Sequence, residues 1–307
     1  MQRGTHDALP DIRNEDVLIY INGDLVPRAQ ATVSVFDAGF LVGDGVWEGI
    51  RLHNDTFVFL DDHLDRLYAG AATIGLDIGL TPDEMKEALL RTVQANAMHD
   101  GVHVRLIVTR GVKKTPAQDP RLTISPPTVV IIAEYKAADP GTAGHGVRLF
   151  TSTIRRPPPD TLDPKLNCNS KLHEVIALVQ ALQAGADEAL MLDVHGAVST
   201  CNATNFFIVK HGEVWTSTGQ HCLNGITRAK VIRLCHEAAI PVHQKDFSLV
   251  DVYGANEAFV TGTFGGLTPV LEVDGRTVGN GEGGALTHRL QRAYRDLVTR
   301  ESGQATA

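Results

Sequence analysis

The sequence is poor in the features that mark several large classes of protein. Its 307 residues include only four cysteines, at 168, 201, 222 and 235, and none of them belongs to a CxxC motif. This argues against a disulfide framework or a metal site and predicts reduced thiols in a cytoplasmic protein. No apolar run approaches the roughly 20 residues that span a bilayer. A net charge of -8 argues against nucleic acid or an anionic membrane as a partner.

The remaining composition, with 43% hydrophobic and 21% charged residues, is ordinary for a globular protein. Residues 1–14 are polar and lack the apolar core of a signal peptide, so we expect a loose tail. Residues 154–165 contain three consecutive prolines from Pro157, which disfavour regular structure and predict a stiff linker. We therefore predict a small α/β domain over residues 15–153 and a larger α/β domain over residues 166–307.

Local patterns predict individual elements. Asn22-Gly23 between two apolar runs predicts a hairpin. Thr81 begins a capping box with proline at the first helical position, and Asp61 and Asp62 can cap an earlier helix. We expect further strands near 47–60, 102–109, 128–134, 146–154, 188–193, 205–217, 257–262 and 268–273, and helices near 171–184, 227–239 and 284–299. Many of these strands are joined by turns, which indicates a mixed α/β fold with much antiparallel sheet.

The most informative segment is residues 223–228, in which an Asn-Gly turn leads through Thr227 into an apolar-periodic helix. A glycine turn at a helix start leaves backbone N–H groups unpaired, and together with the helix dipole they suit a phosphate. Many ordinary capped helices also begin with glycine and threonine. The phosphate interpretation therefore depends on the motifs elsewhere in the chain.

Five segments together resemble the fold-type IV pyridoxal-phosphate enzymes, which include branched-chain aminotransferases, D-amino-acid aminotransferases and aminodeoxychorismate lyases. These segments are residues 43–51, 63–67, 185–193, 225–228, and 261–263 with 268–270. The resemblance extends over nearly the whole chain. It implies a two-domain fold-type IV architecture, pyridoxal 5′-phosphate as the cofactor, an amino acid and a 2-oxo acid as substrates, and a homodimer.

In that family the cofactor phosphate is held by an arginine in an HxxR motif, by the backbone at the Gly-Ile-Thr helix start, and by a later Thr-Gly-Thr segment. A phosphate needs a planar cationic fork and convergent N–H and hydroxyl donors. The resemblance assigns cofactor binding here to Arg66, Leu223, Ile226, Thr227, Gly262 and Thr263. The alternative for Arg66 is a surface arginine that pairs with Asp62 or Asp65.

The family's Schiff-base lysine has no direct counterpart in this sequence. An alignment from Leu162 without gaps puts Asn167 at that position, with Lys165 and Lys171 on either side. An amine is indispensable for the internal aldimine, so one flanking lysine is expected to form it. We prefer Lys171, because branched-chain enzymes carry there a tyrosine near the cofactor's 3′-oxygen, beside the aldehyde carbon. The alternative is a solvated lysine in the first turn of a helix.

Thr200 is a second departure, because the family normally has there a glutamate that pairs with the pyridine nitrogen. A neutral hydroxyl cannot stabilise a proton on that nitrogen by charge, so the ring should be a weaker electron sink. We predict an aminotransferase for small or aliphatic, branched-chain-like amino acids. A lyase or racemase on the same scaffold is one alternative, motivated by Thr200. A non-catalytic relative that binds the cofactor is the other, motivated by Asn167.

The resemblance also implies a substrate side of the site. Trp47 stands at a family aromatic position that lines the pocket, and Gly49 follows in the same motif. His103 and Arg105 share one face of a strand, at positions that approach the substrate carboxylate in relatives, and Phe264 could offer its N–H to that carboxylate. The alternative for His103 is a partly exposed strand histidine. An arginine at position 105 needs an anionic partner if it is buried, which favours a functional role for Arg105. Arg51 could take that role instead.

Overall fold

The computed structural model describes residues 4–5, 8–137 and 146–303, which form two compact units. Unit 1 comprises Met1–Leu9, Ala138–Lys165 and Lys171–Val298, and unit 2 comprises Pro10–Ala137, Leu166–Ser170 and Thr299–Ala307. Within these described ranges, no helix has both the length and the apolar character needed to cross a membrane. The mixed α/β fold with largely antiparallel sheets confirms the predicted fold class.

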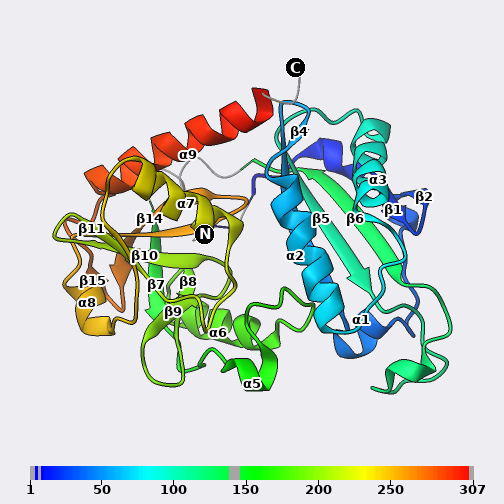
Figure 1. Ribbon diagram of the computed structural model, residues 1–307, viewed down its shortest axis with the longest axis horizontal. Helices are drawn as coiled ribbons and strands as arrows, with labels where there is room; N and C mark the ends of the chain where they lie inside the picture. Colours follow the sequence, from blue (N-terminus) through cyan, green and yellow to red (C-terminus); the bar gives the residue numbers. More distant parts are fainter. Residues whose placement is uncertain (1–3, 6–7, 138–145, 304–307) are drawn as a thin grey trace. The chain divides into compact units, whose positions relative to one another are not determined.

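Unit 2 is built on a six-stranded antiparallel sheet of order β2-β1-β6-β5-β3-β4, and α2 and α3 lie against one of its faces (Figure 1). Alternation along β5 buries Val104 and Leu106 on the helix-covered face and leaves His103 and Arg105 half-buried on the other. The bounds are β1 Leu18–Ile21, β2 Asp24–Pro27, β3 Gly45–His53, β4 Thr56–Phe57, β5 Val102–Thr109, β6 Thr128–Tyr135, α1 Ala38–Val42, α2 Leu60–Thr73, α3 Pro82–Ala95, η1 Ile12–Glu15, η2 Arg28–Gln30 and η3 Pro120–Leu122.

The local signals in unit 2 are mostly confirmed. The hairpin turns at Asn22-Gly23, and α3 begins with the predicted capping box, in which Thr81 and Glu84 bond each other's backbone N–H. The capping prediction for α2 is wrong. Its N-cap is Phe59 in the left-handed region at φ 56°, while Asp61 and Asp62 lie inside the first turn, where their charge only complements the helix dipole.

A short returning segment, Leu166–Ser170, extends the sheet of unit 2 beyond β3. Cys168 forms an antiparallel bridge with Val46. On either side of this bridge, Trp47 N donates to Asn167 O at 3.1 Å and Asn169 N donates to Gly45 O at 3.0 Å. The segment after the proline-rich stretch therefore contributes main-chain pairing to a sheet formed about 120 residues earlier in the chain.

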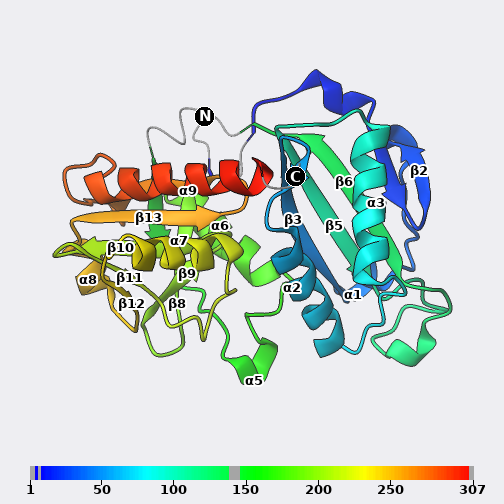
Figure 2. The ribbon, with the colours of Figure 1, turned by 45° about the horizontal axis from the view of Figure 1, so that its top comes forward.

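Unit 1 contains a larger sheet of order β12-β11-β10-β13-β14-β7-β8-β9, with β15 paired to β14. Most neighbours are antiparallel, whereas β11–β12, β14–β7 and β7–β8 are parallel. α6 packs against β7 and β8, α7 packs against β13, and Figure 2 shows α9 running alongside α7. The bounds are β7 Val147–Thr151, β8 Glu188–Leu192, β9 Val198–Cys201, β10 Asn205–Lys210, β11 Glu213–Thr216, β12 Val242–Gln244, β13 Glu257–Gly262, β14 Gly266–Val273, β15 Arg276–Thr277, α5 Pro159–Leu162, α6 Leu172–Gln183, α7 Ile226–Glu237, α8 Leu249–Tyr253 and α9 Ala285–Gly303.

Three sequence expectations differ from the structure in their boundaries. β7, which we grouped with the N-terminal domain, belongs to unit 1 because it pairs with β14 and β8. The proline stretch is not wholly irregular, since Pro159 occupies the first position of the short helix α5, where its missing N–H costs nothing. Of the expected loose tail, residues 1–3 and 6–7 lie outside the described residues, and Ile12 already begins the helix η1.

α6 has an unusual distribution of side chains. Its inward side is formed by Ala177 and Ala181, which pack with Met191 of β8, together with the buried Glu174. Its outward side is apolar, since Leu172 is 71% exposed and Leu182 is 57% exposed, with Val175, Ile176 and Val179 between them also exposed. A helix that directs its large apolar side chains outward marks a surface for interaction.

Candidate active site

In unit 2, a buried carboxylate holds the arginine of the HxxR motif. Glu48 of β3 is fully buried, and α2 brings His63 and Arg66 onto it. Arg66 donates from Nε to Oε1 and from Nη2 to Oε2, both at 2.7 Å, and His63 Nδ1 lies 2.7 Å from Oε2. His63 and Arg66 are three residues apart, so they share one face of the helix. The paired fork fixes the plane of the guanidinium.

The charge of Glu48 is stabilised by these two neighbours. Burial alone would raise the pKa of the Glu48 carboxyl, but the hydrogen bonds from Arg66 and His63 outweigh burial and lower that pKa below its usual value. Glu48 is therefore ionised at neutral pH. In the described structure Arg66 pairs with Glu48.

The opposite face of β3 and β5 carries the predicted substrate residues of unit 2. Arg105 is paired across the strands with Gly49, and its guanidinium carbon lies 3.7 Å from the centroid of the Trp47 ring. Burial lowers the pKa of Arg105, and the negative charge of Glu48 acts in the opposite direction. The expected anionic partner is not found, because no carboxylate among the described residues forms an ion pair with Arg105. Its charge is accommodated on the aromatic face instead.

The absence of a side chain at Gly49 allows the close approach of His103. A Cβ at position 49 would lie 3.1 Å from His103 Nε2, closer than side chains usually pack. Trp47, Gly49, His103 and Arg105 therefore form one group on the half-buried face of the unit 2 sheet.

Asn167, at the position of the family's lysine, binds the backbone of β3. Its Nδ2 donates to Trp47 O at 2.6 Å, and the Trp47 indole Nε1 donates to Cys168 O at 3.0 Å. Asn167 is only 5% exposed, and its Oδ1 is buried without a protein hydrogen-bond partner among the described residues. The amide thus positions Trp47 and supplies no amine.

In unit 1, the start of α7 is shaped by Asn205 and Gly225. Asn205 Nδ2 donates to Leu223 O at 2.9 Å, and a Cβ at Gly225 would lie 2.1 Å from Asn205 Oδ1, so any other residue there would force Asn205 to shift. The first helical hydrogen bond runs from Ala229 N to Gly225 O. The N–H groups of Ile226 and Thr227 precede that bond and have no partner within the helix. This is a favourable geometry for an anion.

The turn between β13 and β14 lies close to the start of α7. Tyr294 of α9 connects them, because its OH is 3.4 Å from Thr227 Oγ1 and its ring lies 3.4 Å from where a Cβ would stand on Gly266. Gly262 pairs with Gly266 at the base of this turn, which carries Thr263 and the buried Phe264. A small pocket beside the turn is lined by Thr5, Thr204, Val260, Gly262, Gly265, Gly266 and Thr268.

Thr200 lies in the same unit on β9 and is 5% exposed. Its hydroxyl donates to Thr204 O at 2.8 Å and accepts from Asn205 Nδ2 at 3.4 Å. Because a carbonyl cannot donate, the hydroxyl proton is committed to Thr204. In this arrangement Thr200 offers a ligand a lone pair and no proton.

The two candidate lysines have different environments within unit 1. Lys171 is the N-cap residue of α6 and its side chain is 27% exposed, with Nζ 3.7 Å from Glu174 Oε1. Lys165 is exposed, and its backbone N–H donates to Asp163 Oδ1. Of the two lysines, Lys171 is thus the one that forms an ion pair with a buried carboxylate.

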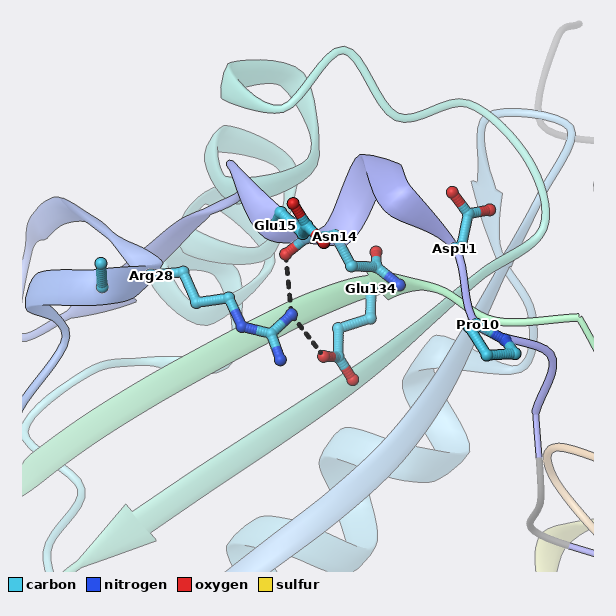
Figure 3. A pocket seen from close by; sticks show the side chains of 7 residues that line it. Pro10, Asp11, Asn14, Glu15, Arg28 and Glu134 are labelled. Atoms are coloured by element: carbon cyan, nitrogen blue, oxygen red, sulfur yellow. Dashed lines mark hydrogen bonds and ion pairs between the residues drawn. The ribbon is translucent and has the colours of Figure 1, made fainter.

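A hollow of about 620 Å³ elsewhere in unit 2 contains none of the predicted site residues (Figure 3). Arg28 reaches into it, donating to Asn14 O at 2.7 Å and pairing with Glu134 at 3.3 Å. The described part of the chain contains no group of three His, Cys, Asp or Glu side chains suited to hold a metal ion.

Sequence reasoning missed the residues that support the predicted ones. Glu48 lay within a recognised motif, and the spacing of His63 and Arg66 could have indicated a shared partner on the facing strand. Asn205 and Tyr294 gave no such signal, because their contacts join positions 18 and 67 residues apart.

The sequence profile described as amino-transferase class IV matches residues 45–273, about three quarters of the chain. The chain belongs to the class IV aminotransferases. Among its relatives in this family, branched-chain-amino-acid aminotransferase-like protein 1 of Arabidopsis thaliana is 40% identical over 296 residues, which cover 96% of this chain and 53% of that protein. The chain therefore spans about half the length of this plant relative.

A putative branched-chain-amino-acid aminotransferase of Methanocaldococcus jannaschii is 41% identical over 283 residues, covering 92% of this chain and 96% of that protein. Among solved structures, the T.th. branched-chain amino acid aminotransferase with pyridoxamine 5′-phosphate has a TM-score of 0.87 and 31% identity, covering 93% of this chain and 95% of that one. Class IV membership and this fold confirm the resemblance drawn from the five sequence segments.

Proposed function

We propose that the protein is a pyridoxal-phosphate-dependent aminotransferase that acts on small or aliphatic, branched-chain-like amino acids and their 2-oxo acids. The observation that carries this proposal is the glycine-initiated α7 beside the Gly262–Thr263 turn. Both relatives described above are named as branched-chain aminotransferases or as similar to them, and the solved neighbour contains pyridoxamine 5′-phosphate.

The residues of unit 1 fit the phosphate of this cofactor. Gly225 leaves room that a Cβ would fill, the N–H groups of Ile226 and Thr227 start the helix, and Thr261 Oγ1 is a buried hydroxyl without a hydrogen-bond partner among the described residues. Thr263 and Gly262 would add donors from the β13–β14 turn. Within unit 2, Arg66 is proposed as a cofactor ligand because its planar cationic fork suits a phosphate. Leu223 would contribute to the cofactor site ahead of α7.

When bound, the cofactor supplies an aldehyde that links to an amine and a ring that accepts electrons. Lys171 would provide that amine and carry the proton between the substrate carbon and the cofactor carbon at its Nζ. Thr200 would lie at the ring nitrogen and accept a hydrogen bond there. Asn167 aligns with the family's lysine but cannot provide an amine, and this supports Lys171 as the residue that does.

The substrate residues of unit 2 suit an amino acid with a short apolar side chain. Arg105 would bind the carboxylate by exchanging its stacking partner Trp47 for an anion, and His103 would assist it. In unit 1, the N–H of Phe264 is the remaining proposed substrate contact. Trp47 would provide an apolar surface, and the lack of a side chain at Gly49 keeps the approach open.

A homodimer and a cytoplasmic location complete the proposal. The exposed apolar side of α6 would be covered by a second copy of the chain, because five large apolar side chains on one helix are rarely left in water. All four cysteines are free and buried, as suits a reducing compartment.

The test is an amino-transfer assay with L- and D-forms of alanine, valine, leucine and isoleucine, combined with borohydride trapping and peptide mapping. We expect transfer to 2-oxo acids and a trapped label on Lys171. Lys171→Ala should abolish both, and Lys165→Ala is the matched control that should retain both. Release of ammonia or inversion of configuration without an acceptor would favour the lyase or racemase alternative. Retained cofactor without any label would favour the non-catalytic one.

A further inference from the structure

Lys171 belongs to a charged cluster around the buried carboxylate of Glu174. Arg156 Nη1 donates to Glu174 Oε1 at 2.7 Å, and Lys171 Nζ lies 3.7 Å from the same oxygen. His173 Nδ1 lies 3.0 Å from the other oxygen, Oε2. All four residues belong to unit 1. The carboxylate thus has one close cationic partner and one more distant one, which is Lys171.

The position of this carboxylate is fixed from the linker side. Arg156 is 3% exposed, its Nε donates to His221 O at 3.2 Å, and its Nη1 lies 3.1 Å from His173 Nε2. His221 in turn lies 4.0 Å from Asp193. Arg156 is therefore held by contacts that do not involve Lys171, and it anchors Glu174 independently of the lysine.

The location of Lys171 explains why it needs this partner. A lysine at the N-cap of α6 sits where the helix dipole disfavours a cation. A carboxylate three residues later, on the same side of the helix, offsets that repulsion. Burial alone would raise the pKa of Glu174, but His173, Lys171 and Arg156 together lower it to about 2, so Glu174 is ionised at neutral pH.

We propose that Glu174 is a positioning residue for Lys171: its carboxylate, anchored by Arg156, holds the lysine amine at the start of α6 and favours its protonated form. This inference rests on the proposed function, because only that function makes Lys171 the amine that links to the cofactor.

Two charges act on the Lys171 amine in opposite directions. Glu174 stabilises the ammonium, whereas the nearby cation of Arg156 opposes it. Removing the carboxylate should therefore lower the pKa of Lys171 while leaving the other lysines unchanged. Partial unfolding would instead move every lysine toward the value of a solvated side chain.

The experiment measures the pKa of Lys171 in the cofactor-free protein. Reductive methylation with formaldehyde over a range of pH, followed by mass spectrometry of the peptide, reports the fraction of neutral amine at each lysine. In Glu174→Gln we expect the midpoint for Lys171 to fall by about one pH unit. Lys165 is the internal reference and should not move. Glu174→Asp should retain most of the wild-type midpoint.

An unchanged Lys171 midpoint in Glu174→Gln would overturn the proposal, as would an equal shift at Lys165. Borohydride trapping with pyridoxal phosphate on the same samples separates this result from the proposed function. A label on Lys165, or none, would remove Lys171 from the reaction, while the methylation midpoint alone decides whether Glu174 controls its amine.

Discussion

Arg66 and Glu48 form a bidentate ion pair in which both N–O distances are 2.7 Å, between a helix and the strand beneath it. The arginine was identified in the sequence as a phosphate ligand. Its partner is a fully buried carboxylate that also pairs with His63. The pair orients a cation that would otherwise have several rotamers, and it has consequences that can be measured.

The first prediction concerns this pair. Glu48→Gln should remove the buried carboxylate charge that pairs with Arg66 and lower the free energy of unfolding by about 3 kcal/mol, because the variant removes one partner of a buried ion pair. Urea unfolding of the cofactor-free protein measures this loss, and pyridoxal phosphate titration should show weaker binding. Glu87→Gln on the exposed side of α3 is the control and should change neither.

The second prediction concerns acid. The pKa values of Glu48 and Glu174 are both lowered on folding. A carboxyl with a lowered folded-state pKa contributes stability above its unfolded pKa, and that stability is lost as the pH falls through the folded value. The free energy of unfolding should therefore decline between pH 4.5 and about 2. In Glu174→Gln this decline should be shallower, and an identical slope in urea unfolding at several pH values would contradict the assignment.

The third prediction tests the glycine at the start of α7. Gly225→Ala would bring a methyl group within 2.1 Å of Asn205 Oδ1, so Asn205 must shift. We expect a loss of about 1–3 kcal/mol in stability and weaker binding of inorganic phosphate. Gly254→Ala, where the nearest atom would be 3.4 Å away, is the matched control. Equal thermal melting of the two variants would argue against this cradle.

The fourth prediction concerns Thr200. Thr200→Glu places an unpaired carboxylate at a site that is 5% exposed, so the cofactor-free protein should be destabilised. If position 200 faces the ring nitrogen, bound cofactor should restore this loss, and the melting temperature should rise more on cofactor addition than in the wild type. Thr200→Val is the comparison, because it removes the hydroxyl's hydrogen bonds to Thr204 O and from Asn205 Nδ2 at about 1 kcal/mol each and adds no charge.

The fifth prediction concerns the outer side of α6. The double variant Val175→Glu, Val179→Glu should convert a dimer into a monomer, because it places two charges at the centre of the exposed apolar side of α6. Light scattering coupled to size-exclusion chromatography measures this change. Gln183→Glu, at the exposed end of the same helix, should remain dimeric. A monomeric wild type would refute the proposed dimer.

The sequence predicted best where its signals were local. The capping box at Thr81 and the hairpin at Asn22 depend on a few adjacent residues, and both are confirmed. The start of α2 at Phe59 was missed because a non-glycine residue rarely adopts positive φ. The placement of β7 was missed because strand neighbours are set by long-range pairing that a sequence pattern does not contain.

The candidate site shows the same difference between local signals and long-range contacts. Motif resemblance supplied Arg66 and Thr227, whereas their supports Glu48 and Tyr294 became visible only through contacts in the fold. The environment of Lys171 was likewise hidden, because Arg156 approaches Glu174 from the linker. A single sequence identifies groups that bind or react more readily than the residues that orient them.

The return of Leu166–Ser170 to β3 has a consequence for biosynthesis. While the ribosome is still making residue 137, the backbone groups of Gly45 and Trp47 lack the partners that Asn167 and Asn169 later provide. The hydroxyl of Thr56 likewise has to await its acceptor, the carbonyl of Ser302, which lies near the end of the chain. Unit 2 therefore cannot be completed as the first half of the protein emerges, and its last hydrogen bonds form only when nearly the whole chain has been translated.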